Sequence, residues 1–278
     1  MSIWYISPSG NDSTGNGSIG TPWATISKAH TSASAGDTII CKDGTYSWVS
    51  QTFTKSLTIQ SENDGLAVFN GGGTNISWTA SSSITLALSG LIFEDATSGG
   101  NTGSGRIFCV SGGITFSLTI SRCVLRDLTV FDISGWPGSI FMARGTMIVS
   151  IISCAIYDIV ETNANKSALF AQFVSGALTV TITNCIFYND LAAVPYVAYR
   201  STATLEFVVK NTIFYTSVAR AWQTGTPTYT GSGSNLIYGY TSPAAIYTLS
   251  TDPLFYDAAS GNFGLRPTSP CLNAGTLV

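Results

Sequence analysis

The sequence contains a ten-residue segment that recurs at a fixed interval. Its clearest copies each contain one cysteine and are Leu118–Asp127, Val149–Asp158 and Val180–Asn189. The cysteines are residues 123, 154 and 185, so both intervals (154 − 123 and 185 − 154) are 31 residues. Weaker copies are Thr85–Glu94, Phe207–Thr216 and two segments that end at Gly239 and Asp257. Self-similarity at a fixed period of this size predicts a repeat architecture.

Apolar and polar residues alternate within each copy, as in Val180, Ile182, Cys185 and Phe187. This period-2 pattern is interrupted once, by a polar residue before the cysteine, which is typical of two short strands joined by a tight turn. Gly, Ser, Asn and Thr residues connect the copies. The sequence therefore predicts an all-β fold, a single-stranded right-handed parallel β-helix whose coils hydrogen-bond to one another.

The repeats continue through most of the chain without a linker, so we expect one domain over residues 1–278. Residues 1–46 form its N-terminal cap and first coil, residues 47–239 its repeating coils, and residues 240–278 its last coil and C-terminal cap. A short capping helix is predicted over Thr21–Ala33, with Thr21 as its N-cap and Pro22 at its first position. His30 belongs to this cap, where a structural role is expected.

Two terminal segments carry a family resemblance. The opening residues, WYISPSGNDSTGNGSIGTPWATISKA from Trp4 and AGDTIICKDGTYS to Ser47, resemble the opening of right-handed parallel β-helix proteins of the pectate-lyase-like superfamily. DPLFYDAASGNFGLRPTSPCLNAGT, Asp252–Thr276, resembles the closing segment of the same group. The resemblance implies the fold. It does not choose an activity, because the group includes lyases, hydrolases, phage tailspikes and proteins with no known chemistry.

The composition excludes several kinds of partner. Charged residues make up only 10% of the chain and the net charge is −3, which argues against nucleic acid. No apolar run approaches the ~18 residues of a membrane helix, so membrane insertion is not expected. A strand candidate, Ile3–Ile6, begins at once, without a signal peptide. We therefore expect a virion-surface or extracellular protein. Either its signal peptide has been removed, or the protein leaves its cell inside a virus particle.

Three of the six cysteines are predicted to be buried thiols, and Cys41, Cys109 and Cys271 are left unassigned. Cys123, Cys154 and Cys185 occupy equivalent positions on successive coils, where side chains point in parallel and have the wrong geometry for disulfides. The chain has one histidine and no CxxC motif, so neither a metal nor another cofactor is expected.

Counting from the cysteine position gives columns of stacked side chains. Two residues later lies an inward column, Ile92, Leu125, Ile156, Phe187, Phe214, Ile237 and Phe255. The next position is outward and reads Phe93, Arg126, Tyr157, Tyr188, Tyr215, Tyr238 and Tyr256. Such a strip suits a subunit interface, plain stacking beneath loops, or contact with sugar rings. Those loops are predicted over Ala96–Gly105, Asp132–Ser139, Glu161–Ser167 and Ala192–Ser201.

A further position places acidic residues in one column, Glu94, Asp127 and Asp158. A coil spacing of about 4.8 Å would put Asp127 and Asp158 about 5 Å apart and Glu94 about 10 Å from Asp158. These separations are near those of retaining and inverting glycosidases, and repulsion would raise one pKa as a general acid requires. Turn capping by the aspartates and cation binding remain alternatives.

Two functions follow from these patterns. The first is a virion surface protein, tailspike-like, fibre-like or capsid-decorating, that binds host glycan or other virion proteins as a homotrimer. The second is an extracellular glycoside hydrolase or lyase that uses Asp127 and Asp158, with Glu94. Pectate lyases of the resembling group place an Arg or Lys base beside several Asp residues. Arg126, Arg144 and Arg200 could serve as the base, but the Asp-rich cluster is absent from the sequence.

Overall fold

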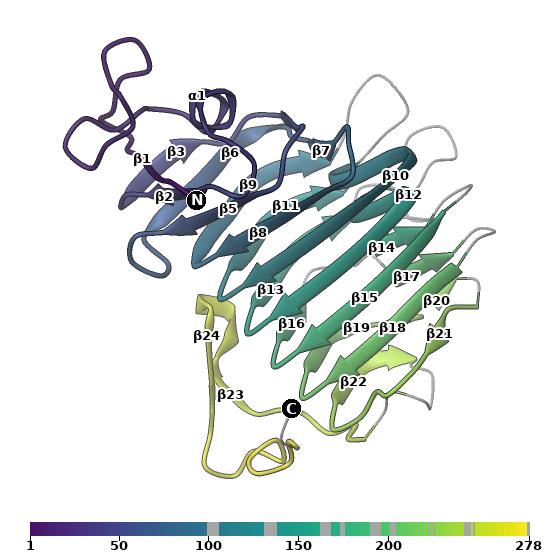
Figure 1. The fold of residues 1–278 in the computed structure, drawn as a ribbon. Coiled ribbons are helices and arrows are strands. Elements are labelled where there is room, and N and C mark those ends of the chain that lie inside the picture. The colour runs from purple at the N-terminus through teal and green to yellow at the C-terminus, as the bar shows by residue number, and fades with distance from the viewer. Residues whose placement is uncertain are drawn as a thin grey trace.

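The computed structural model describes residues 1–98, 106–130, 138–161, 168–172, 176–189, 196–200, 204–221, 223–224, 226–241, 246 and 248–276. Two sheets of stacked parallel strands face each other along the length of the molecule (Figure 1). The chain alternates between the sheets, so each coil pairs with the coil before and after it. The predicted parallel β-helix is confirmed.

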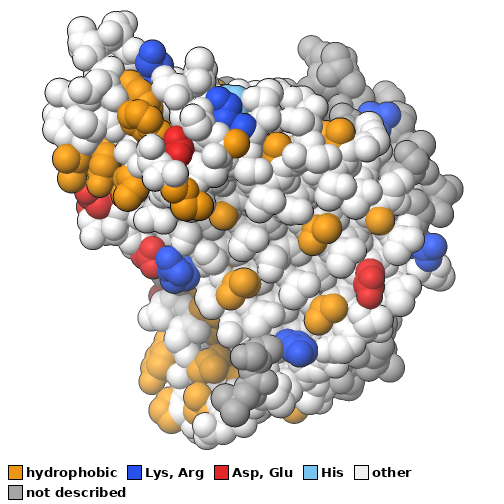
Figure 2. All heavy atoms as spheres, in the orientation of Figure 1, with side chains coloured by type: hydrophobic (Ala, Val, Ile, Leu, Met, Phe, Trp, Pro, Cys, Tyr) orange, Lys and Arg blue, Asp and Glu red, His pale blue; other side chains and the backbone are white. Residues whose placement is uncertain are grey.

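The first sheet contains fourteen strands among the described residues. Its main path is β1 (Ile3–Ile6), β2 (Thr38–Cys41), β5 (Leu57–Ser61), β8 (Ile84–Ser89), β10 (Arg106–Ser121), β12 (Ser139–Ile152), β14 (Ala168–Gln172), β17 (Tyr196–Arg200) and β20 (Gln223–Thr224). The branches are β4 (Gln51–Phe53), β7 (Trp78–Ala80), β15 (Ala177–Thr183), β18 (Thr204–Lys210) and β21 (Thr228–Tyr229). Figure 2 shows that the outer face of this sheet carries few charges and only isolated apolar side chains.

The second sheet forms the opposite wall and has eight strands in the described part of the chain. In spatial order they are β3 (Gly44–Ser47), β6 (Ala67–Asn75), β9 (Leu91–Ser98), β11 (Val124–Val130), β13 (Ala155–Glu161), β16 (Ile186–Asn189), β19 (Ile213–Ala221) and β22 (Leu236–Thr241). Strand β17 lies within the predicted loop Ala192–Ser201, which is a correction. The central parts of the other three predicted loops lie outside the described residues.

Inward side chains of equivalent positions stack between the sheets. Phe108, Phe141 and Phe170 form one file, with ring centroids 5.5 Å and 5.0 Å apart. Phe187 and Phe214 stack at 4.5 Å on the opposite wall. Because equivalent inward positions stack on one another, a shift of one residue would move the whole inward set of a coil to the outer face. This stacking fixes the register.

A ladder of thiols occupies the corner between the sheets. The backbone N–H of Cys123 donates to Sγ of Cys154, and that of Cys154 donates to Sγ of Cys185, both at 3.4 Å. Each of the six cysteines is a free thiol, and these three are buried. The predicted single file of cysteines is confirmed.

The N-terminal helix is shorter than the sequence suggested. Helix α1 covers Ile26–Ser32, and its N-cap is Thr25, whose side chain accepts a hydrogen bond from the N–H of Lys28. The prediction of Thr21 as N-cap is wrong. Trp23 pairs with β1 instead, donating its N–H to Tyr5 and accepting from Ser7, so the chain is extended there. No helix of the described residues is long and apolar enough to cross a membrane.

The C-terminal segment leaves the solenoid. Strand β23 (Phe255–Asp257) pairs antiparallel with β24 (Asn262–Leu265), and a short 3-10 helix (Ala258–Ser260) joins them. The segment that ends at Asp257 was predicted as the last copy of the repeat. It forms a hairpin beside the stacked coils instead (Figure 1).

Candidate functional site

The outer face of the second sheet carries one polar and aromatic column. Strand register places Asn70 opposite Glu94, Glu94 opposite Arg126, and Arg126 opposite Tyr157. The column then continues through Tyr188, Tyr215 and Tyr238. The column was predicted correctly from Arg126 to Tyr238. Its first member was predicted as Phe93, and Glu94 takes that place, whereas Tyr256, predicted as its last member, lies on β23 of the C-terminal hairpin.

Glu94 does not lie in the column of Asp127 and Asp158. Gly90, at φ 67°, occupies the left-handed corner position that Arg122 and Ser153 occupy in later coils. The next residue, Leu91, donates its N–H to Sγ of Cys123 and so takes the cysteine position. The predicted register of this copy is therefore wrong by one residue, and Phe93 fills the inward column instead of Ile92. Aligning the copies on the corner residue would have found this.

Arg126 links the acidic part of the column to the aromatic part. Its Nε and Nη2 donate to Oε2 of Glu94 at 2.9 Å and 2.6 Å, and its Nη1 donates to the hydroxyl of Tyr157 at 3.2 Å. Nδ2 of Asn70 donates to the other carboxylate oxygen of Glu94 at 3.0 Å. Burial opposes ionisation of Glu94, but the bonds from Asn70 and Arg126 and the charge of Arg126 outweigh it. The pKa of Glu94 is lowered as a result.

Asp127 lies on the open side of this group. Its carboxylate is 3.7 Å from Nε of Arg126 and its side chain is 57% exposed. Partial burial raises the pKa of Asp127, Arg126 opposes that rise, and the charges of Glu94 and Asp95 add to it. The net shift is upward. The pKa values of Glu94 and Asp127 are thus displaced in opposite directions on the two sides of one guanidinium.

Asp158 follows Asp127 on the next strand. The neighbouring pairs Arg126–Tyr157 and Leu128–Ile159 place the two aspartates opposite each other. Both have left-handed backbones, with φ 53° and 54°, and Asp95 at φ 51° precedes them in the same column. Short polar residues tolerate this conformation best, so the bend alone accounts for aspartate here. The side-chain roles predicted for Asp127, Asp158 and Glu94 remain predictions.

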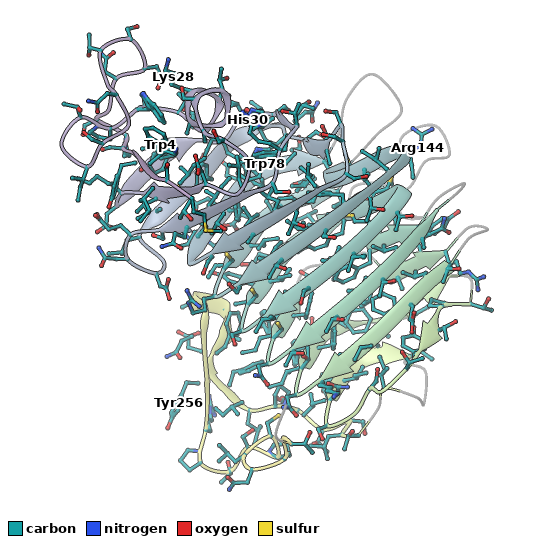
Figure 3. All side chains as sticks on the ribbon, in the orientation of Figure 1. Trp4, Lys28, His30, Trp78, Arg144 and Tyr256 are labelled. Atoms are coloured by element: carbon teal, nitrogen blue, oxygen red, sulfur yellow. The ribbon has the colours of Figure 1, made fainter. Side chains whose placement is uncertain are left out.

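Of the three arginines proposed as a base, one lies beside these carboxylates. Arg144 and Arg200 belong to β12 and β17 of the first sheet, and Figure 3 shows Arg144 on the opposite side of the molecule from Tyr256. Arg126 is on β11. Within the described residues, no cluster of three or more His, Cys, Asp or Glu side chains could hold a metal ion.

The tyrosines form a stack that is partly covered. The rings of Tyr188 and Tyr215 are 4.8 Å apart and inclined by 12°, and those of Tyr215 and Tyr238 are 5.2 Å apart and inclined by 13°. Tyr157 and Tyr188 are buried, at 9% and 6% exposure. The column was predicted to face outward, with stacking beneath a cover as one alternative, and these two tyrosines are covered, whereas Tyr215 and Tyr238 are half-buried.

The cover is the C-terminal hairpin. The ring of Phe263 lies 5.1 Å from that of Tyr157 and 5.5 Å from that of Tyr188, and Phe255 packs on Tyr188 as well. The cover predicted from the sequence was the set of loops between the repeats, which does not include this hairpin. A short loop that contains Gly261 separates two apolar segments here, and such a pattern indicates a hairpin that the sequence could have predicted.

A groove lies between the C-terminal hairpin and the tyrosines Tyr188 and Tyr215, and the sequence did not predict it. Its volume is about 290 Å³. It is lined by Tyr188, Tyr215, Asp252, Leu254, Phe255, Tyr256, Asp257, Ala258, Ala259 and Arg266. The column repeat could not reveal it, because one wall comes from residues outside the repeat.

Comparison with known proteins gives likeness at the level of the fold. No protein-family model matches the chain, and no curated protein sequence matches it. The structure is similar to the PL6 family alginate lyase AlyGC, with a TM-score of 0.54 and 17% identity over 91% of this chain and 35% of that chain. It is also similar to pectate lyase Pel9A, with a TM-score of 0.50 and 14% identity over 91% of this chain and 73% of that one.

What these proteins share is a parallel β-helix. This chain spans about a third of the length of the alginate lyase. At 14% and 17% identity the likeness concerns the fold and assigns no residue a role.

Proposed function

We propose that this protein is a polysaccharide-degrading enzyme whose substrate lies against the side chains of Asp127 on β11 and Asp158 on β13. The observation that carries the proposal is the pair of carboxyl groups on either side of Arg126. Glu94 is held ionised, whereas Asp127 is open to solvent with a raised pKa. An exposed carboxyl group whose pKa is raised is what a general acid requires, and the ionised Glu94 holds Arg126 in place beside it.

In this proposal Asp127 is the general acid. Its carboxylic acid gives a proton to the glycosidic oxygen as the bond from that oxygen to the anomeric carbon breaks. Asp158, about 4.8 Å away along the stack, attacks the anomeric carbon and forms a glycosyl ester. Water then hydrolyses the ester while the Asp127 carboxylate takes a proton from it. Glu94 positions Arg126, whose charge sets the local field.

The similarity to an alginate lyase and a pectate lyase supports a carbohydrate substrate and an extracellular site of action. Lyase chemistry is the other form of the same proposal, with Arg126 near the reacting sugar. The two forms differ in product. Elimination leaves an unsaturated sugar that absorbs ultraviolet light, whereas hydrolysis leaves a new reducing end without that absorbance.

The test is depolymerisation of neutral and acidic polysaccharides by wild-type protein and matched variants. We expect Asp127→Asn and Asp158→Asn to lower the rate by about 10²-fold or more, the usual contribution of a positioned acid or base. Asp64→Asn is the control, since Asp64 is an exposed aspartate in a separate ion pair with Arg122. Unchanged rates in both site variants, or no cleavage of any polysaccharide by the wild type, would refute the proposal.

A second candidate is a glycan-binding protein of a virion surface, tailspike-like or capsid-decorating, that assembles as a homotrimer. The low content of charged residues, 10%, and the half-buried Tyr215 and Tyr238 favour it. Light scattering at micromolar concentration would then give three times 29.2 kDa. A single species of 29.2 kDa would exclude the trimer, and capsid or tail genes beside the coding gene would support the virion.

A further inference from the structure

The guanidinium of Arg126 is held from two sides. Its Nε and Nη2 donate to the same oxygen of Glu94, Oε2, and its Nη1 donates to the hydroxyl of Tyr157 at 3.2 Å. Glu94 lies on β9 and Tyr157 on β13, the strands on either side of β11. The bonds of this one side chain therefore join three coils, and the direction of Nη1 depends on where the Tyr157 ring lies.

The C-terminal hairpin fixes the Tyr157 ring. The hairpin lies beside β13 and β16 (Figure 1), and its Phe263 meets the ring of Tyr157 edge-on at 5.1 Å. Gly261, in the turn of the hairpin, lies against the phenol, since an added Cβ would be 3.2 Å from the hydroxyl oxygen and 3.6 Å from Cζ. Its φ of 75° is in the left-handed region that glycine adopts most readily. Residues from outside the repeat thus enclose Tyr157 and leave it 9% exposed.

Asp127 lies beside the same guanidinium but is not bonded to it. Its carboxylate is 3.7 Å from Nε of Arg126, which is too long for a hydrogen bond. Each of the three guanidinium nitrogens already donates to Glu94 or Tyr157. Without the Tyr157 hydroxyl, Nη1 would lose its acceptor, and a charged donor without an acceptor is costly in a partly buried place. The exposed carboxylate of Asp127 is then an acceptor of opposite charge close at hand.

We propose that Tyr157 is a positioning residue, which holds the guanidinium of Arg126 against Glu94 and short of a hydrogen bond with Asp127, and that the hairpin keeps Tyr157 in this place. The inference rests on the proposed function, because the proton that it concerns is the one that Asp127 would give to the glycosidic oxygen. An arginine bonded directly to Asp127 would favour the ionised carboxylate, so the carboxyl group would hold its proton less firmly. Tyr157 thus acts on the proposed acid through Arg126.

The charged groups around Asp127 come from three neighbouring strands. They are Glu94 and Asp95 on β9, Arg126 on β11 and, opposite Asp127, Asp158 on β13. Partial burial raises the pKa of Asp127, Arg126 opposes that rise, and the charges of Glu94 and Asp95 add to it. Removal of the Tyr157 hydroxyl frees the arginine and touches none of the three carboxylates. A fall in the pKa of Asp127 would therefore report that Arg126 has moved towards it.

Carbon-13 NMR titration of the Asp127 carboxyl group tests this in the full chain without any substrate. Tyr157→Phe removes the hydroxyl and keeps the ring that packs against Phe263. We expect the pKa of Asp127 to fall by about one pH unit, the lower end of the effect of an adjacent arginine on an aspartate. Phe263→Ala should shift it in the same direction, because it loosens the hairpin over Tyr157. Tyr238→Phe is the matched control, since it removes a hydroxyl from the same column on β22 and should leave the titration unchanged.

An unchanged or raised pKa of Asp127 in folded Tyr157→Phe protein would overturn the positioning role, and so would an equal fall in Tyr238→Phe. Thermal unfolding shows that each variant keeps its fold. Depolymerisation is measured separately. In a wild-type protein that cleaves a polysaccharide, the alkaline limb of the kcat/KM profile should move to lower pH in Tyr157→Phe by the same amount. A protein that cleaves no polysaccharide and still shows the fall in pKa would lose the proposed function and keep the role of Tyr157 towards Arg126.

Discussion

At the scale of single residues, two ion pairs of the same chemistry differ in their surroundings. Arg126 and Glu94 have side chains that are 36% and 17% exposed, whereas Arg122 and Asp64 are 58% and 54% exposed. Water screens the charges of the second pair, so the attraction between its two side chains is weak. In the first pair, loss of one partner leaves the other with unmatched donors or acceptors in a drier environment. Similar contact distances, 2.7 Å and 2.6 Å, therefore do not mean equal contributions to stability.

Glu94→Gln and Asp64→Asn make a matched comparison, because each removes a charge and keeps the shape. We expect Glu94→Gln to lower the free energy of unfolding by about 1–2 kcal/mol and Asp64→Asn by less than about 1 kcal/mol. Urea denaturation at neutral pH measures both. Equal losses in the two variants would contradict the difference in burial as the cause.

The Glu94 contribution also depends on pH in a definite sense. The pKa of Glu94 is lowered in the folded protein, so the unfolded chain binds its proton first as the pH falls. The stabilisation is complete above the unfolded pKa and is lost as the pH falls through the folded one. The gap between wild type and Glu94→Gln should therefore close in acid, which repeating the urea series below pH 4 would reveal.

At the scale of elements, the capping helix depends on a neutral histidine. His30 on α1 is 8% exposed, and its Nε2 accepts from the backbone N–H of Thr54 at 3.2 Å. Its ring meets Phe53 edge-on at 5.5 Å. Burial and then the nearby charge of Lys55 lower the pKa of His30. Protonation would replace the acceptor by a second donor facing Thr54.

We expect the cap to weaken as the solution becomes acidic. Since the folded pKa of His30 lies below its ordinary value of about 6.5, its stabilisation is present above that value and disappears as the pH falls through the folded pKa. Thermal unfolding between pH 7.5 and 5 should show this loss. The His30→Gln variant keeps an acceptor for Thr54 without titrating, so its profile over this range should be flatter. An identical slope in both proteins would rule out His30 as the cause.

The same helix shows where local sequence signals mislead. Thr21-Pro22 has the form of a helix start, but Trp23 pairs with β1 and its indole donates to the carbonyl of Gly15 at 3.0 Å. Asp12 instead holds the hydroxyl of Thr25 at 2.7 Å, and Thr25 begins the helix. These partners are distant along the chain, so no local pattern could reveal them.

At the scale of the whole molecule, the sequence repeat predicted those features that follow from the stacking of coils. Stacked coils place equivalent residues together, so the file of Cys123, Cys154 and Cys185 and the tyrosine column could be read from spacing alone. The coil with Gly90 was misplaced because its corner residue differs from the polar ones in later copies. That single step separated Glu94 from Arg126, its ion-pair partner. The hairpin was unpredictable from the column pattern because its contacts cross the coils.

The hairpin should behave as a cooperative unit separate from the coils. Phe263 joins Tyr157, Tyr188 and Phe255 through ring contacts of 5.1–5.5 Å, whereas the coils are held by their own ladders and inward rings. Phe263→Ala should thus destabilise the hairpin by about 1–2 kcal/mol, given that Phe263 is half-exposed. Amide exchange over Phe255–Leu265 should accelerate about tenfold or more while Ala177–Thr183 in β15 is unchanged. Acceleration of both segments by one factor would mean that hairpin and solenoid unfold together, and the groove between them would then be as rigid as the coils.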